Sequence, residues 1–334
     1  MGLKVLFIGD TSGKPDEGMK KICSTLQLEF DVRDGISSEF VSVKKALSDY
    51  RLYQDVDIIH YIAGPTYRSI ILLFLLRRRI KKAKTILSFT HPHWNFICDI
   101  LFSLIPPDAV IVQSKKWFDW GKRKKLKMDS VPLSGVDLEK FHPVSKEAKE
   151  KLKQELGLDS NKKVVLHAGH LNPNRNLDCF ISLGNSPDFQ PVIIASTTTI
   201  VNQDLEKRLK EGNVLILREY ISEIEKYYQA ADFYLFPTIS PRACVQIPLS
   251  VIEAMATNTP IISTKFEGLP FYFPAEKNII NYVSEEELND LPAFLSDSAR
   301  AMHIPDNLEE IKSMSWNCIA DRLLEFYQKV ISDE

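Results

Sequence analysis

The stretch Lys163-Val-Val-Leu-His-Ala168 decides the fold, because this short apolar run restarts, in mid-chain, a pattern that already fills the first half. In the first half, apolar runs typical of buried strands alternate with longer segments of helical periodicity. Strands that alternate with helices predict parallel sheets covered by helices. We therefore predict two doubly wound α/β domains, with strands at residues 4–8, 56–61, 84–89, 109–112, 163–168, 192–195, 214–217, 233–236 and 260–263.

The length of the chain agrees with two domains. Its 334 residues exceed what one hydrophobic core usually organises, and domains of about 150 residues are the expectation. Between the two halves, the segment 131–143 contains prolines and a glycine that favour an extended linker, so we place the boundary near residue 145. Apolar residues at helical spacing predict an amphipathic helix over 316–331.

Composition argues against several classes of protein. The net charge of -2 and the pI near 6.4 argue against nucleic-acid binding, since duplex binders are strongly basic. The 5 cysteines are scattered without a CxxC pair, so neither a disulfide framework nor a zinc site is predicted. The N-terminus lacks a signal-peptide pattern, and the longest apolar run, 70–76, is far shorter than the roughly 20 residues of a membrane span. We expect a cytoplasmic location.

Basic charge is concentrated in one part of the first half. Residues 66–128 contain 14 Lys and Arg against 3 Asp, a net charge of +11, which leaves -13 for the rest of the chain. Trp117, Phe118 and Trp120 alternate with lysines. This composition suits a peripheral contact of residues 70–84 and 115–127 with an anionic membrane. The alternative is a core helix over the apolar run, solvated lysines and tryptophans that pack inward; nucleic acid is the least favoured partner.

Four motifs follow one another along the chain: Ser134-Gly-Val-Asp-Leu-Glu-Lys-Phe-His-Pro143, His167-Ala-Gly-His-Leu-Asn-Pro-Asn-Arg175, Tyr228-Gln-Ala-Ala-Asp-Phe-Tyr-Leu-Phe-Pro237 and Val251-Ile-Glu-Ala-Met-Ala256. In this order they resemble the retaining GT-B glycosyltransferases, the group 1 glycosyltransferase family. The resemblance covers the chain from about residue 85 onward.

The resemblance implies a fold and a reaction. The fold has two Rossmann-like domains facing a central cleft: an acceptor-side domain (1–145 plus 315–334, with the C-terminal helix crossing back to it) and a donor-binding domain (146–314). The reaction is the retaining, metal-independent transfer of a sugar from a nucleotide diphosphate sugar to a glycan or lipid-linked acceptor. No cofactor is expected, and no dense cluster of Asp and His suggests a metal.

The donor residues follow from the same resemblance. Family members hold the diphosphate with an arginine and a lysine five positions apart, and here His170 and Arg175 occupy those positions. Arg175 can bind phosphate with two parallel hydrogen bonds, whereas His170 is partly charged near neutral pH. Glu253, expected at a helix start, corresponds to the family's carboxylate for the ribose hydroxyls. Without the motifs, the alternative is that Arg175 is a solvated residue at a helix start and His170 is a loop histidine. Glu253 would then be a favourable partner of the helix dipole.

The sequence departs from the family eight residues before Glu253. The first carboxylate of the family pair is replaced by Val245, and the glycine-rich stretch beside it by Gln246, Ile247 and Pro248. Gln246 or Arg242 could substitute through side-chain hydrogen bonds. The departure motivates a rival function, a nucleotide-sugar-binding or partner-binding paralogue that has lost turnover. A dinucleotide oxidoreductase is disfavoured, because no GxGxxG follows the first strand of either domain.

The remaining site predictions concern loops. His91 and His93 follow the strand at 84–89, where His91 resembles the family's histidine beside the sugar and His93 could line the acceptor side. Gly268 is a further point of close approach to the donor phosphate. The loop that contains Gly13 and Gly18 is not a P-loop, since its glycines are too close together, and the family places it on the acceptor side.

Overall fold

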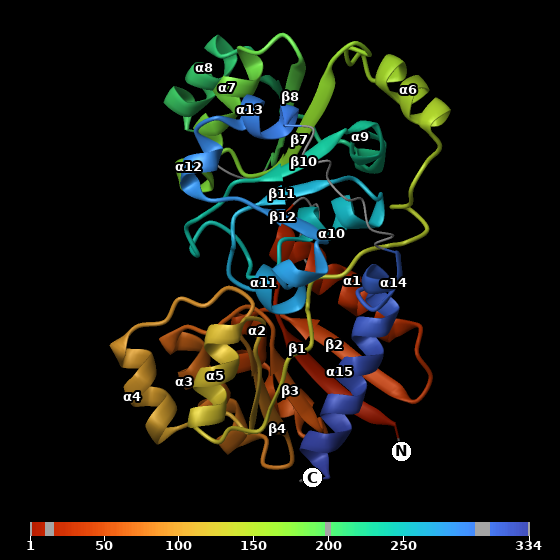
Figure 1. Ribbon diagram of the computed structural model, residues 1–334. Coiled ribbons are helices and arrows are strands. Elements are labelled where there is room, and N and C mark those ends of the chain that lie inside the picture. The colour runs from red at the N-terminus through yellow and green to blue at the C-terminus, as the bar shows by residue number, and fades with distance from the viewer. Residues whose placement is uncertain (1, 11–16, 198–201, 298–307, 333–334) are drawn as a thin grey trace. The chain divides into compact units, whose positions relative to one another are not determined.

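The computed structural model describes residues 2–10, 17–197, 202–297 and 308–332 (Figure 1). The chain forms two compact units: unit 1 comprises 1–135, 244–247 and 316–334, and unit 2 comprises 136–243 and 248–315. Each unit is built on a six-stranded sheet whose paired strands are all parallel. The predicted fold class, two doubly wound α/β domains, is confirmed.

Unit 1 has the strand order β2-β1-β3-β4-β5-β6. Its core packs apolar side chains of the central strands against α3, α4 and α5. In the described part of unit 1, five helices connect the strands and one 3-10 helix, η1, follows α2. The elements are β1 (Leu3–Ile8), α1 (Gly18–Asp31), β2 (Ile36–Val41), α2 (Val43–Ser48), η1 (Tyr50–Tyr53), β3 (Ile58–Tyr61), α3 (Tyr67–Arg79), β4 (Lys84–Ser88), α4 (Phe96–Leu104), β5 (Ala109–Ile111), α5 (Lys115–Arg123) and β6 (Met128–Asp129).

Unit 2 has the strand order β12-β11-β10-β7-β8-β9. Its core lies between the central strands and the helices α7, α8 and α13. The elements are α6 (Lys146–Glu155), β7 (Lys163–Gly169), η2 (Pro173–Arg175), η3 (Leu177–Cys179), α7 (Phe180–Gly184), β8 (Phe189–Ala195), α8 (Gln203–Glu211), β9 (Leu215–Leu217), α9 (Ile224–Ala230), β10 (Phe233–Phe236), α10 (Leu249–Ala256), β11 (Ile261–Ser263), α11 (Leu269–Tyr272), η4 (Ala275–Lys277), β12 (Ile280–Tyr282), α12 (Glu285–Leu288), α13 (Leu291–Ser296) and α14 (Leu308–Lys312).

The last helix, α15 (Trp316–Ile331), has the bounds predicted from its periodicity and packs in unit 1 against α1. Its buried Tyr327 hydroxyl lies 2.6 Å from Nδ1 of His60 on β3, and Nε2 of His60 lies 2.6 Å from the Ser88 hydroxyl. At the surface, Arg33 hydrogen-bonds to Asp321. These contacts join the C-terminus to the first sheet, as the resemblance implied.

None of the helices in the described parts of the chain combines the length and the apolar content needed to cross a bilayer.

Two buried histidines should make stability depend on pH. Burial lowers the pKa of His60 in unit 1, and of His167 in unit 2, from 6.5 to about 3. As the pH falls from 6.5 towards 3, the unfolded chain therefore binds protons that the folded chain excludes. The contribution is fully present above pH 6.5, and below it we expect a loss of about 1.4 kcal/mol per pH unit for each histidine.

Urea unfolding at about pH 7 and about pH 5 measures this loss. The exposed His142 provides the control substitution, His142→Gln, which removes a histidine without disturbing a buried contact. In His60→Gln, the pH dependence of unit 1 should decrease. An unchanged slope in that variant would show that His60 does not contribute.

Candidate functional site

The carboxyl edge of the second sheet collects several of the predicted donor residues. β7 ends at Gly169, and the chain continues through the half-buried His170 into the turn η2. The turn forms because the Asn172 side chain accepts a hydrogen bond from the Asn174 N–H and Pro173 occupies the first position. Since β7 and β10 are parallel neighbours, η2 lies beside the end of β10. The turn thus places Arg175 at this edge.

Arg175 is a buried cation that has no acidic partner among the residues that the structure describes. Its side chain is only 4% exposed, and among the described residues it makes neither an ion pair nor a side-chain hydrogen bond. Its Cζ lies 5.9 Å from the ring centroid of Phe236, the last residue of β10. A buried charge without a partner is costly to maintain, so the surroundings of Arg175 are suited to a bound anion.

His167, for which the sequence predicted no role, lies beside Arg175. Its Nδ1 is 2.9 Å from the carbonyl of Leu235, which can only accept, so Nδ1 carries the proton and Nε2 is left as an acceptor. Burial, and next the positive charge of Arg175, lower the pKa of His167 to about 3. The imidazole is therefore neutral.

Gly169 separates these two side chains. A Cβ atom at Gly169 would lie 2.5 Å from Nη1 of Arg175 and 3.4 Å from Nε2 of His167. The φ angle of Gly169 is +156°, which L residues rarely adopt. Glycine therefore leaves the space that the guanidinium occupies.

Glu253 lies in the same neighbourhood, although its position in the helix was predicted wrongly. α10 begins at Leu249, so Glu253 is inside the helix rather than at its start. Its buried carboxylate accepts a hydrogen bond of 2.9 Å from the Tyr228 hydroxyl, and burial and the charge of Glu253 raise the pKa of Tyr228. The pKa of Tyr234 is raised by burial, lowered by the charge of Arg175 and raised by that of Glu253. Both charges thus act on one tyrosine.

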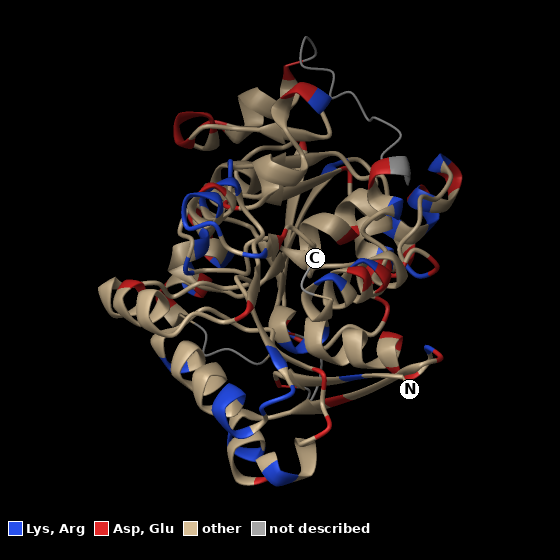
Figure 2. Cartoon of the chain, turned by 90° about the horizontal axis from the view of Figure 1, so that it is seen from below, with Lys and Arg blue, Asp and Glu red and all other residues tan. Residues whose placement is uncertain are grey.

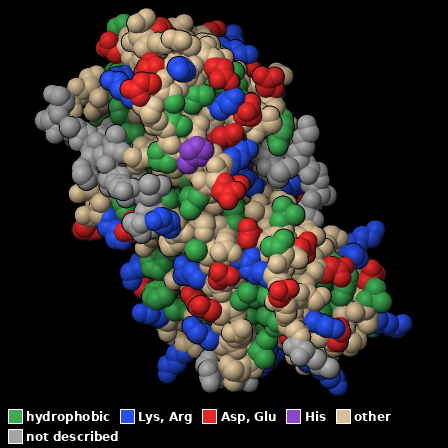
Figure 3. Space-filling view, turned by 90° about the vertical axis from the view of Figure 1, so that its right-hand side faces the viewer, with side chains coloured by type: hydrophobic (Ala, Val, Ile, Leu, Met, Phe, Trp, Pro, Cys, Tyr) green, Lys and Arg blue, Asp and Glu red, His purple; other side chains and the backbone are tan. Residues whose placement is uncertain are grey.

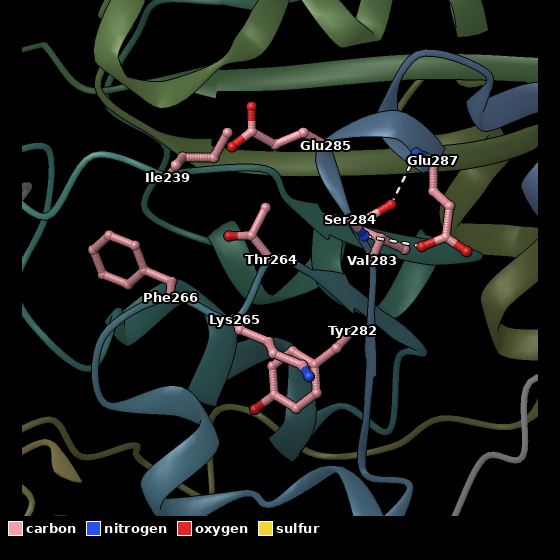
Figure 4. Close-up of a pocket in the computed structure, with 9 residues that line it drawn as sticks. All are labelled: Ile239, Thr264, Lys265, Phe266, Tyr282, Val283, Ser284, Glu285 and Glu287. Carbon is pink, nitrogen blue, oxygen red and sulfur yellow. Dashed lines mark hydrogen bonds between the residues drawn. The ribbon is translucent and has the colours of Figure 1, made fainter. Parts of the chain in front are cut away.

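A pocket opens at the same edge of the sheet (Figure 4). Its volume is about 510 Å³, and segments that follow β10, β11 and β12 line it. Neither Arg175 nor Glu253 lines this pocket, but the Phe266 ring does, and it packs 5.4 Å from the Phe236 ring that Arg175 contacts. The lining residues are Ile239, Thr264, Lys265, Phe266, Tyr282, Val283, Ser284, Glu285 and Glu287.

Residues 148–305 match the family described as glycosyl transferases group 1. The chain carries a group 1 glycosyltransferase domain. This match confirms the family predicted from the four motifs.

Curated relatives of the group 1 domain are named as glycosyltransferases or as a synthase. A D-inositol 3-phosphate glycosyltransferase of Corynebacterium glutamicum is 27% identical over 231 residues, which is 61% of this chain and 52% of the relative. An α-maltose-1-phosphate synthase of Mycolicibacterium smegmatis is 24% identical and covers 67% of this chain and 63% of its own length. The chain spans about half the length of the curated relatives it matches.

Solved structures of similar fold cover nearly the whole chain. Anabaena HepE in complex with UDP and glucose has a TM-score of 0.74 at 16% identity, over 98% of this chain and 100% of that one. A glycosyltransferase of Rickettsia africae has a TM-score of 0.76 at 17% identity, over 100% of both chains. At this identity the likeness shows the fold, and it confirms the Rossmann-like domains of the GT-B class.

Residues 244–247, which include most of the segment that departs from the family, pack in unit 1, although they lie within the sequence range of the group 1 domain. The Gln246 N–H donates to the Thr90 carbonyl at 2.9 Å, and the Ser134 hydroxyl donates to the Ile247 carbonyl at 2.6 Å. Gln246 and Val245 are buried. The structure therefore places Gln246 beside the loop that begins at Thr90, in the unit that also holds His91.

The histidine loop follows the end of β4. The His91 N–H donates to the Gly64 carbonyl and the His93 N–H to the Pro65 carbonyl, at 3.0 and 2.9 Å. The two imidazole rings lie 4.7 Å apart, with His91 half-buried and His93 exposed. The backbone thus brings the two predicted histidines together at the carboxyl edge of the first sheet.

Two of the three predicted site glycines lie at the start of helices. Gly18 is the first residue of α1, and Gly13 lies outside the described residues. In the group 1 domain, Gly268 immediately precedes the short helix α11, two residues after the pocket residue Phe266. Within the described ranges, no group of three or more His, Cys, Asp or Glu could hold a metal ion.

Proposed function

We propose that this protein transfers a sugar from a nucleotide diphosphate sugar to an acceptor. The observation that carries the proposal is Arg175, a buried cation that no described residue neutralises, at the carboxyl edge of the donor-side sheet. Ligands of open α/β sheets bind at this edge. The structures of HepE with UDP and with UDP-glucose support a nucleotide-sugar donor for this chain also.

Different residues of unit 2 would bind different parts of the donor. As the sugar leaves, negative charge develops on the diphosphate, and Arg175 would stabilise it with two parallel hydrogen bonds. The half-buried His170 would add a third donor. Glu253, which lies outside the lining of the pocket of about 510 Å³ at this edge, would accept hydrogen bonds from the ribose. Gly268 would allow the backbone to approach the phosphate.

The finer parts of the proposal concern the reaction and the acceptor. The transfer would need no metal, since the cationic Arg175 would supply the charge that the leaving diphosphate needs. Retention of the anomeric configuration is what the family resemblance implies. His91, Gln246 and His93 of unit 1 would face the sugar and the acceptor. The concentration of Lys and Arg in residues 66–128 supports an acceptor at an anionic surface, such as a lipid-linked glycan on the cytoplasmic face of a membrane.

A panel of nucleotide sugars, beginning with UDP-glucose, tests the proposal. At least one member should raise the Tm of the protein, since a ligand that binds only the folded state stabilises it. The same donor should then label a lipid-linked acceptor in a transfer assay. If no nucleotide sugar changes the Tm, the proposed donor site is wrong.

Val245 favours one rival function. This buried valine occupies the position at which the family has its first carboxylate, and Gln246 beside it is held in unit 1 by its backbone. A nucleotide-sugar-binding paralogue would show a rise in Tm with a donor, but neither transfer nor hydrolysis of that donor. The panel therefore distinguishes the two functions.

A further inference from the structure

Helix α4 presents an exposed apolar face that none of the described residues of unit 1 covers. Residues four positions apart on a helix share one face. On α4, Phe96, Ile100 and Leu104 form such a series, and Ile97 lies beside Phe96. The exposed fractions are 72% for Phe96, 39% for Ile97, 54% for Ile100 and 72% for Leu104.

The opposite face of α4 is anchored in the core. Cys98 and Phe102 are buried, and the Phe102 ring lies 5.0 Å from the Trp120 ring of α5. Trp117 is buried as well, at 4.9 Å from Phe89. The tryptophans near residues 115–127 therefore pack inward, as the alternative interpretation held, and they do not supply an apolar surface. That surface lies on α4 instead.

Helix α3, which packs against α4, adds cations to this surface. The exposed residues of α3 include Arg68, Ile71, Leu75 and Arg78, which follow one another at spacings of three and four and so form one stripe. The guanidinium carbons of Arg68 and Arg78 lie 5.5 and 5.4 Å from the ring centroids of Tyr67 and Phe74. An arginine at each end of an apolar stripe suits the boundary between lipid headgroups and acyl chains.

Helix α5 adjoins α4 through Trp120 and is also cationic. Lys115, Lys116, Lys122 and Arg123 of α5 are exposed, and Figure 2 shows Lys and Arg on several helices of the chain in blue. By contrast, the face seen in Figure 3 mixes acidic, basic and hydrophobic side chains.

The three acidic residues of this region are all engaged by neighbours. Asp99 accepts from Trp94 Nε1 at 3.0 Å, Asp108 pairs with Arg77 at 2.8 Å, and Asp119 pairs with Lys115 at 2.6 Å. The apolar face is thus bordered by positive charge that these acids do not balance.

We propose that α4 docks on an anionic lipid bilayer, with its apolar face inserted among the headgroups and the cations of α3 and α5 on the lipid phosphates. The charge favours an anionic occupant, since a basic partner would be repelled, a neutral partner would gain no electrostatic attraction, and an anionic surface would be attracted. The docking surface is defined as Phe96, Ile97, Ile100 and Leu104 with Arg68 and Arg78. This proposal rests on the proposed function, because it specifies how the glycosyltransferase would reach an acceptor in a membrane. Vesicle binding nevertheless tests the docking surface by itself, since the assay needs no nucleotide-sugar donor.

Vesicle sedimentation tests the docking surface. The full chain should bind vesicles containing about 30% phosphatidylglycerol much better than pure phosphatidylcholine, and less well in about 500 mM than in about 50 mM salt. The triple variant Phe96→Ser, Ile100→Ser, Leu104→Ser should bind at least about 10-fold more weakly, because it removes the inserting side chains. Arg68→Gln with Arg78→Gln should lower binding to the anionic vesicles specifically.

Matched controls use residues of similar exposure elsewhere. Leu28, Val32 and Leu52 of unit 1 are 66%, 79% and 74% exposed, and their triple replacement by serine should leave vesicle binding unchanged. Lys146→Gln with Lys151→Gln on α6 is the charge control. Nucleotide-sugar binding by the α4 variant should equal that of the wild type, which separates this inference from the proposed function.

Two outcomes would overturn the proposal. One is vesicle binding that is independent of anionic lipid, or equally reduced by the control triple. The other is a wild-type protein that does not bind vesicles but forms a dimer in analytical ultracentrifugation, where the α4 triple variant is a monomer. The apolar face of α4 would then bind a second copy of the chain.

Discussion

Replacing Arg175 with alanine should lower kcat/KM for transfer by about 10²- to 10³-fold while the protein stays folded. The reason is that Arg175 is buried without a described acidic partner, so its charge is available to the leaving diphosphate. Removing a buried, unpaired charge does not weaken folding, and the Tm should stay the same or rise. Initial rates at varied donor concentration and a thermal melt give the two quantities.

Arg208 of α8 is the matched control for Arg175. It is an exposed arginine of the same unit, and it forms an ion pair with Asp178 at 2.9 Å. Since exposed ion pairs contribute little to stability, Arg208→Ala should change neither transfer nor Tm appreciably. If Arg175→Ala unfolded the protein, Arg175 would be a structural residue and the donor assignment would fail.

Gly169→Ala should lower kcat/KM by about 10²-fold through a displacement of Arg175, because misplacing a catalytic group by about 1 Å has effects of this size. The new methyl group would lie 2.5 Å from Nη1 of Arg175, so the guanidinium has to move. The substitution also forces alanine to a φ of +156°, which costs stability in addition. Steady-state kinetics and urea unfolding separate the two effects.

Gly157→Ala introduces backbone strain at a positive φ without the steric contact. Gly157 has a φ of +67°, and a Cβ atom there would meet nothing within 4 Å. We expect Gly157→Ala to lower stability by about 1 kcal/mol and to leave kcat/KM unchanged. Equal loss of activity in the two variants would mean that strain, and not the position of Arg175, governs transfer.

The fold could be predicted because its central strands are buried. Each of the nine predicted strands corresponds to an observed strand, with bounds that differ by a few residues. The sequence did not reveal β2, β6 and β12. β2 alternates half-buried and exposed residues at the edge of its sheet, while β6 and β12 are too short to show a period. Edge strands take their structure from their neighbours, which composition does not show.

The site could be predicted only where the chemistry is local in sequence. The family resemblance placed His170 and Arg175 after the first strand of the second domain, and in the structure both follow β7. His167 was missed because a lone polar residue inside an apolar run resembles a core histidine. Gln246 was assigned to the donor domain, whereas a hydrogen bond to Thr90, 156 positions away, places its segment in unit 1. Such long-range backbone pairing has no signature in the local sequence.

The docking surface, too, could not be located from the local sequence. The sequence indicated a membrane contact through residues 70–84 and 115–127, from their charges and aromatic residues. The segment that forms α4 is apolar almost all round, so its periodicity does not say which face is buried. Only the packing of Phe102 against Trp120 determines that Phe96, Ile100 and Leu104 face outward.

Calorimetric titration of UDP and of uridine into the wild type and into Arg175→Ala isolates the contribution of the diphosphate. If Arg175 holds that group, UDP should bind the wild type at least about 10-fold more tightly than uridine, and Arg175→Ala should lose most of this difference while its affinity for uridine is kept. If neither UDP nor uridine binds, the same comparison can be made between GDP and guanosine and between ADP and adenosine. An undiminished preference for the diphosphate in the Arg175→Ala protein would contradict the proposed donor site.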